Sequence, residues 1–186
     1  MTPALTSTAL ALHDLGLAAG FGGSLFGKFA LNPTVKAISS PEERGQVVNA
    51  AWNGYNVINA VSLGTTALTW LIGRSALSGR EFGKDVRRWV IAKDICLGAT
   101  LATGFYNLFA GAYLLKKQHD EGLPMESGSE PSERAPEDAK IAQKSVNYLG
   151  IVNLCAMAGV IVTTAVLNNK AGASHRWAGF AKYVLP

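Results

Sequence analysis

The sequence has few charged residues, and over long stretches it has none. Only 16% of its 186 residues are Asp, Glu, Lys or Arg, whereas 48% are hydrophobic. Three windows, 50–72, 95–115 and 146–167, contain no Asp, Glu, Lys, Arg or His. Helices in the core of a soluble protein usually keep a polar stripe that faces water. The lack of such a stripe argues against a soluble fold.

Cysteines and catalytic motifs are also scarce. Cys96 and Cys155 lie in apolar windows without CxxC spacing or a partnering histidine, which favours apolar packing over a disulfide or a metal site. There is no GxSxG, P-loop or HExxH motif and no carboxylate pair at a workable spacing. His13, His119 and His175 are scattered, so a bis-histidine haem site is not expected. We predict no metal site and no cofactor, although a bound lipid or quinone-like molecule is compatible with the sequence.

What the chain does contain is four apolar windows of the length that crosses a bilayer. They are 9–31, 50–72, 95–115 and 146–167, and each is close to the roughly 20 residues that cross a hydrocarbon core of about 30 Å. The sequence therefore predicts one all-α domain, residues 1–186, that folds as an integral membrane four-helix bundle. The first window lacks a basic n-region and a convincing cleavage site, so we interpret it as a retained helix.

Proline and capping residues predict where the helices begin and end. Asn32-Pro33 ends the first helix, because proline disfavours helical geometry in the residue before it. Ser40 is a predicted N-cap for a helix that starts at Pro41, with two glutamates at the positive end of its dipole. The same pattern at Pro136 predicts that the last helix runs to about Leu167.

The connections differ sharply in charge. The second one, 73–94, is basic and carries an aromatic anchor, whereas 119–135 is rich in Glu, Ser and Pro and is expected to be disordered. The tail, 174–186, resembles a short interfacial helix, with a frayed terminus as the alternative. Residues expected to contact headgroups or a partner are Arg80, Lys84, Arg87, Arg88, Trp89 and Trp177. The basic cluster favours both termini on the cytoplasmic side, or the matrix or stromal side of an organelle.

Polar and small residues within the windows indicate how the helices meet. The glycine face of the first helix, which predicts close helix packing, comprises Gly16, Gly20, Gly23 and Gly27. The predicted polar interior of the bundle comprises Asn53, Asn56, Asn59, Asn107 and Asn153. These amides either bond to one another across the bundle or line a cavity for a ligand or ion. Lys28 is expected to snorkel to the interface, and Asp14 with His13 marks the interface or faces the interior.

The segment "LHDLGLAAGFGGSLFGKFALNPTVKAI", followed by "EERGQVV", resembles the start of the small four-span proteins of the TMEM-type DUF4149 family. A related four-span pattern occurs in the DUF1772, or anthrone-oxygenase-like, proteins. The resemblance covers the first part of the chain and rests on His13, Gly22, Gly23, Phe26, Pro33 and Gly45. It implies the four-span fold more than an activity.

Two functions follow from these features. The first is a non-catalytic multi-pass membrane protein, an accessory or structural subunit whose partners are lipids and other membrane subunits or further copies of itself, but no nucleic acid. The alternative, suggested by the oxygenase-like resemblance, is a small membrane enzyme for a lipophilic substrate. In that case His13 and Asp14 are the acid–base pair, in a pocket shared with Asn56, Asn59 and Asn107. A transporter has less support, because the chain has neither internal repeats nor broken helices.

Overall fold

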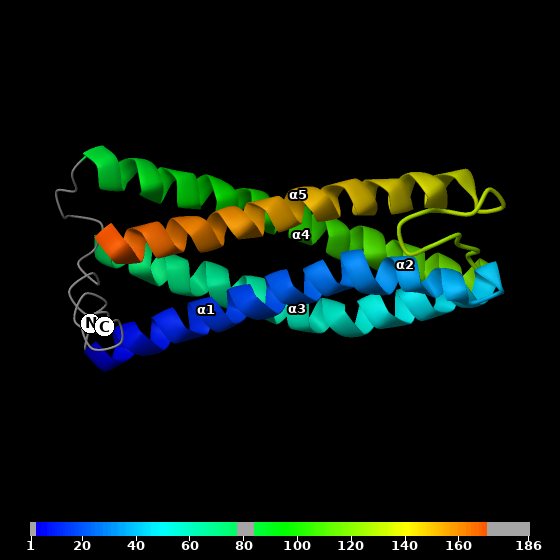
Figure 1. Ribbon diagram of the computed structural model, residues 1–186, viewed down its shortest axis with the longest axis horizontal. Helices are drawn as coiled ribbons and strands as arrows, with labels where there is room; N and C mark the ends of the chain where they lie inside the picture. The colour runs from blue at the N-terminus through cyan, green and yellow to red at the C-terminus, as the bar shows by residue number, and fades with distance from the viewer. Residues whose placement is uncertain (1–2, 78–83, 171–186) are drawn as a thin grey trace, which may run out of the picture.

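The computed structural model describes residues 3–77 and 84–170, and side chains over 7–74 and 86–170 (Figure 1). Four long helices follow one another up and down the molecule. They are α1 (Pro3–Phe26), α3 (Pro41–Leu77), α4 (Lys84–Glu121) and α5 (Glu137–Asn168). Three short elements join α1 to α3: η1 (Gly27–Leu31), α2 (Asn32–Thr34) and η2 (Val35–Ala37). The described ranges hold no strand, so the predicted all-α architecture is confirmed.

The helix boundaries follow the start signals in the sequence. The first residue of α3 is Pro41, and the Glu43 amide donates to Ser40 Oγ at 3.2 Å, which satisfies one of the free amides at this end of the helix. Glu137 begins α5 immediately after Pro136. Proline in the first turn removes an amide that would have no helical partner.

Among the described residues, three helical stretches are long and apolar enough to cross a membrane. They are Ser7–Ala37, Val86–Glu121 and Glu137–Asn168. Helix α3 is equally long but is not among them, and Asn56 and Asn59 lower the mean hydropathy of its most apolar part.

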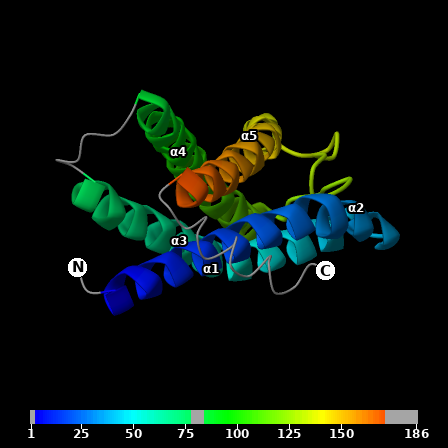
Figure 2. The same ribbon diagram turned by 60° about the vertical axis from the view of Figure 1, so that its left-hand side comes forward.

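The helices form two layers, α1 with α3 and α4 with α5 (Figure 2). The glycine face of α1 brings α1 and α3 close together, as the spacing predicted. A Cβ on Gly16 would lie 2.9 Å from the Ser62 carbonyl oxygen of α3, and one on Gly27 would lie 2.4 Å from the Trp52 ring. Only glycine leaves room for these contacts.

Two apolar clusters fill the ends of the bundle. One comprises Val35, Val48, Leu114, Leu123, Met125, Ala135 and Ala139, and the other comprises Leu17, Trp70, Val90, Leu97 and Val160. Polar side chains are buried along much of the length between them, among them Asn59, Ser62, Thr66, Thr100 and Asn153. The middle of the bundle is therefore polar in a protein whose outer faces are apolar.

The connection between α4 and α5 is ordered, which differs from the disorder expected at 119–135. Residues 119–121 complete α4, and Leu123 and Met125 are 0% and 1% exposed. The Met125 amide donates to the Pro41 carbonyl at 2.9 Å, and the Gly128 amide donates to the Asn32 carbonyl at 3.0 Å. The composition predicted disorder because apolar residues are few here. Two buried apolar side chains are nevertheless enough to hold the loop in place, because its backbone also forms hydrogen bonds with the rest of the protein.

Charges also hold this loop. Lys36 Nζ lies 2.8 Å from Glu130 Oε2, and Arg44 Nη1 lies 3.4 Å from Glu126 Oε2. The ammonium of Lys36 lowers the pKa of Glu130, first by its hydrogen bond and then by its charge. Two of the acidic side chains that suggested disorder therefore pair with basic groups, one on η2 and one in the first turn of α3.

Candidate functional site: an amide-lined cavity

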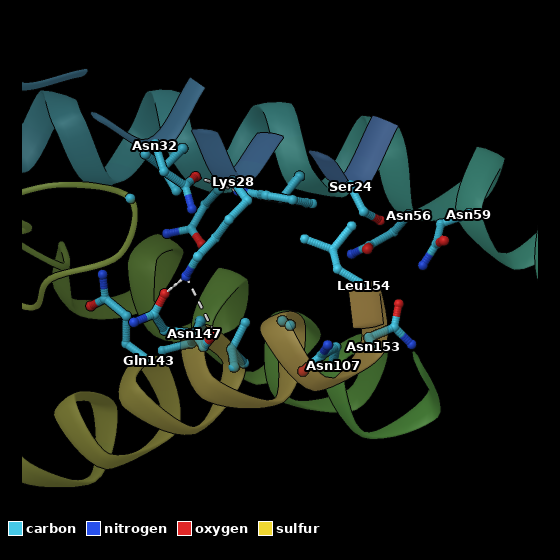
Figure 3. A pocket seen from close by; sticks show the side chains of 18 of the residues that line it. Ser24, Lys28, Asn32, Asn56, Asn59, Asn107, Gln143, Asn147, Asn153 and Leu154 are labelled. Carbon is cyan, nitrogen blue, oxygen red and sulfur yellow. Dashed lines mark hydrogen bonds between the residues drawn. The ribbon is translucent and has the colours of Figure 1, made fainter. Parts of the chain in front are cut away.

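A cavity of about 110 Å³ lies between the four helices, on the side of the bundle that the 122–136 loop covers. Its polar lining is drawn from all four helices and the adjoining turn. These residues are Ser24, Lys28, Asn32, Asn49, Asn56, Asn59, Asn107, Gln143, Asn147 and Asn153. Figure 3 shows the labelled members of this set around a common space. Of the two outcomes expected for the bundle amides, the structure has the cavity, and among the described residues it has no hydrogen bond between two of the predicted amides.

Lys28 reaches the cavity from the break at the end of α1. Pro33 has no amide hydrogen for the carbonyl four residues earlier, and the chain forms the π-turn η1, in which the Asn32 amide donates to the Gly27 carbonyl. From this turn Lys28 Nζ crosses to α5 and donates to the Asn147 side-chain oxygen and, at 3.3 Å, to its backbone oxygen (Figure 3). Lys28 is half-buried and points inward, so the expectation that it snorkels to the interface was wrong.

On α3 the spacing of the asparagines decides which of them face the cavity. Asn49, Asn56 and Asn59 share one face because they are seven and three residues apart, close to whole helical turns. Asn53 was predicted to belong to this interior set, but it is exposed on the outer side of the helix. Six residues separate Asn53 from Asn59, which is about 120° around the helix, and the inner face of α3 at this level is taken by Trp52 and Asn56.

Three buried amide atoms at the cavity have no hydrogen-bond partner among the described residues. They are Asn49 Nδ2, Asn59 Oδ1 and Asn107 Oδ1. The side chains of Asn49 and Asn59 are each only 8% exposed. A buried amide without a partner costs about 1–3 kcal/mol, so native proteins rarely keep several of them together without a reason.

Asn153, by contrast, bonds to the protein through its amide nitrogen. Its Nδ2 donates to the Thr100 carbonyl and to Thr103 Oγ1, both at 2.8 Å. This amide ties α5 to α4 at the inner end of the cavity. Its partners are a carbonyl and a hydroxyl of α4 rather than another of the predicted interior amides.

The outer end of the cavity is closed by side chains that bond to the loop and the turn. Trp52 Nε1 donates to Asn32 Oδ1 at 2.9 Å, and Gln143 Nε2 donates to the Ser127 carbonyl at 3.2 Å. Met125 and Gly128 of the loop also line the cavity. The segment expected to be disordered is thus part of the cavity wall.

A second polar cluster lies at the other end of the bundle. His13 Nδ1 donates to the Thr66 carbonyl at 3.1 Å, which leaves Nε2 as an acceptor for Lys93 Nζ at 3.0 Å. Lys93 also lies over the Trp70 ring, 4.2 Å from its centroid. Both His13 and Lys93 are 3% exposed. Neither residue of this pair lines the amide-lined cavity.

The structure separates the two residues proposed as an acid–base pair. His13 is buried in the interior, whereas Asp14, the next residue of α1, is exposed. Neither residue lines the cavity that contains Asn56, Asn59 and Asn107. The enzyme hypothesis required one pocket that reached all five residues, and the structure does not bring them together.

The remaining predicted contact residues are on the basic connection and the tail. Arg87 and Arg88 are exposed and Trp89 is half-buried on α4. Lys84 begins α4, but its side chain is outside the described set. Arg80, Trp177 and the predicted interfacial tail, 174–186, lie outside the described residues.

No protein-family model, curated protein or solved structure matches the chain. Among the described residues, no three His, Cys, Asp or Glu side chains come together as a metal-binding group. Interpretation of the cavity therefore depends on its own chemistry.

Sequence reasoning missed Lys93 and Asn49 as interior residues. The signal for Lys93 was present: Val90, Lys93, Leu97 and Thr100 are spaced three or four residues apart, and all are buried. Lys93 was instead counted with the charges of the basic connection, because it lies two residues before the apolar window.

Proposed function

We propose that this protein is a non-catalytic, multi-pass membrane protein that binds a small polar ligand between its four helices. The observation that carries the proposal is the set of three unpartnered amide atoms, on Asn49, Asn59 and Asn107, around one cavity. In a low-dielectric interior each such group favours a bound molecule that completes its hydrogen bonds. Binding sites in helical membrane proteins are typically built in this way, from polar side chains that face the bundle interior.

Membrane insertion of all four helices is part of this proposal. The outer face of α3 is apolar, with Val57, Val61, Leu68 and Leu71 each at least 60% exposed, while its asparagines other than Asn53 point inward. On α1 and the following turn η1, exposed apolar side chains run from Leu10 to Phe29, about 29 Å at 1.5 Å per residue, with the exposed Asp14 near one end of this stretch. These faces support a lipid environment around α3 as well as the other three helices.

The proposed topology keeps both termini on the cytoplasmic side, or its organellar equivalent, and α1 begins at the same end of the bundle at which α5 finishes (Figure 1). A chain that crosses a membrane four times has both ends on the same side. Reporter fusions at the two ends of the chain test it, and both should report the same compartment.

An accessory or structural role in a larger assembly remains a second part of the proposal. The glycine face of α1 was one reason for it, but that face is occupied by α3 within the chain. Its remaining support is the exposed pair Arg87 and Arg88 beside Trp89. The mass of the particle extracted in mild detergent tests this role, and a strict monomer without a copurifying protein would contradict it.

Native mass spectrometry of the full chain, extracted from its own membrane, tests ligand binding. After the detergent is stripped, the wild-type protein should retain a non-covalent adduct. Asn59→Leu, which fills the cavity, should lose this adduct, whereas Asn53→Leu, the same change on the outer face of α3, should retain it. Equal adducts in the two variants, or a bare wild-type polypeptide, would contradict the proposal.

A further inference from the structure

We infer that the ligand of the amide-lined cavity is a small organic anion, of the hydroxycarboxylate class, with its carboxylate bound at Lys28 and its hydroxyl turned toward Asn59 and Asn107. The inference rests on the proposed function and adds the charge, size and polarity of the ligand. It draws on three separate features of the cavity: its charge, the arrangement of its donors and acceptors, and its volume.

The charge of the cavity is positive. Lys28 is the only ionisable residue in its described lining, and no Asp or Glu lines it. The hydrogen-bond acceptors that Lys28 Nζ has in the structure are two oxygens of Asn147, both uncharged. With no carboxylate beside it, the Lys28 ammonium is free to form a charge-assisted hydrogen bond with an anion that enters the cavity.

The arrangement of donors and acceptors adds the polar inner end of the ligand. Asn49, with its unpartnered Nδ2, is on the side toward the loop, whereas Asn59 and Asn107 lie further in. The contacts of two glycines of α4 give this order, because Gly104 lies against Leu63 and Asn153 while Gly111 lies against Asn56. The amides of Asn59 and Asn107 each carry an oxygen that accepts and an NH2 group that donates, so a hydroxyl, which does both, matches them.

The distance between these groups is short. Asn147, which marks the level of the Lys28 ammonium, and Asn153 are six residues apart on α5, about 9 Å along the helix axis. Two hydrogen bonds of about 3 Å each leave room for only a few atoms between the polar ends of the ligand.

The volume of the cavity also limits the ligand to a few atoms. A dry protein cavity of about 150 Å³ accommodates benzene, with its six carbon atoms. The cavity here has about 110 Å³, so a ligand of about six non-hydrogen atoms is at the upper end of what it holds without movement of the loop. A fatty acid or a quinone ring with its tail is too large for this space.

Lactate, lactamide and propionate serve as probes, because they are nearly equal in size. Lactamide lacks the charge and propionate lacks the hydroxyl. The rise in the thermal unfolding midpoint of the full chain in detergent, at constant ionic strength set with sodium chloride, measures binding. We expect lactate to bind at least about tenfold more tightly than lactamide, since a hydrogen bond to a charged group is worth about 1.5–3 kcal/mol. Propionate should fall between the two.

Variants at Lys28 make the test specific. Lys28→Met should abolish the preference for lactate, Lys28→Arg should keep it, and Lys144→Met, which removes an exposed lysine of α5, should have no effect. If Lys28→Met does not fold, binding of lactate, lactamide and propionate is compared in Lys28→Arg and Lys144→Met. The same preference for lactate in both of these variants still supports an anionic ligand.

The possible failures can be separated. Equal binding of lactate and lactamide, or a preference that survives in Lys28→Met, would overturn the anionic assignment and leave the proposed function intact. No binding of any probe would also overturn it. The native mass measurement then shows independently whether the cavity holds some other molecule.

Discussion

The imidazole of His13 and the ammonium of Lys93, 80 residues apart in the chain, meet at 3.0 Å inside the bundle. Lys93 has no carboxylate partner within ion-pairing distance among the described residues. Its charge is instead stabilised by a neutral ring nitrogen and by the face of Trp70. This pair joins α1 to α4, whereas most contacts of α1 are with α3.

His13→Ala should therefore destabilise the protein by about 3 kcal/mol, since it leaves a buried ammonium without its acceptor. Lys93→Met should cost less, because it removes the buried charge itself. In a double-mutant cycle the combined variant should be more stable than the sum of the single changes implies. Unfolding in detergent micelles measures these effects, with Asp120→Asn, at an exposed site near the other end of α4, as the control. Additive effects would contradict a direct interaction.

Gly23 and Gly22 offer a matched test of helix packing. A Cβ at Gly23 would lie 2.2 Å from the Tyr55 ring, whose hydroxyl donates to the Gly20 carbonyl at 2.6 Å, whereas a Cβ at Gly22 would have nothing within 4 Å. Gly23→Ala should destabilise the bundle by about 1–3 kcal/mol through overpacking. Gly22→Ala should be neutral or slightly stabilising, because alanine favours the helix. Equal midpoints for the two variants would show that the α1–α3 contact is wrong.

Gly45 holds the loop against α3. A Cβ there would lie 2.0 Å from the Leu123 carbonyl oxygen, so Gly45→Ala must displace the loop backbone. We expect faster cleavage of residues 122–136 in limited proteolysis and weaker retention of the cavity ligand. Gly54→Ala, on the same helix with open space around it, should digest like the wild type. Unchanged cleavage of Gly45→Ala would contradict the loop packing.

The same loop should loosen in acid. Lys36 lowers the pKa of Glu130, so this carboxylate stabilises the folded loop at any pH above its ordinary pKa. The contribution is lost as the pH falls through the lowered, folded-state value. The protection factor of the Gly128 amide, which donates to the Asn32 carbonyl, should fall over that interval once the exchange rate is corrected for the intrinsic effect of pH. Glu130→Gln should exchange faster at neutral pH and lose this part of the pH dependence; an unchanged pH profile would exclude the ion pair as its cause.

Much of the fold could be predicted because helix geometry is local. Ser40 and Pro41 define the start of α3 by their own chemistry, and the spacing of the α1 glycines specifies a single packing face whatever packs against it. The inward direction of Asn56 and Asn59 follows from the same periodicity.

The rest depended on tertiary contacts. Lys28 turns inward because Pro33 produces a π-turn and because Asn147, distant in sequence, supplies two acceptors. The loop is ordered because carbonyls at Asn32 and Pro41 are in reach of its amides. Neither partner can be identified from local composition. The charge and size of the cavity could not be predicted from the sequence either, because they depend on how the four helices and the loop pack together.

The central claim is that the interior amides surround a bound molecule rather than one another. A high-resolution density map of the protein isolated from its native membrane tests it most directly. The account predicts non-protein density in the cavity, within hydrogen-bonding distance of Lys28 Nζ and of the Asn59 amide. A collapsed interior in which Asn59 and Asn107 bond to each other would contradict it.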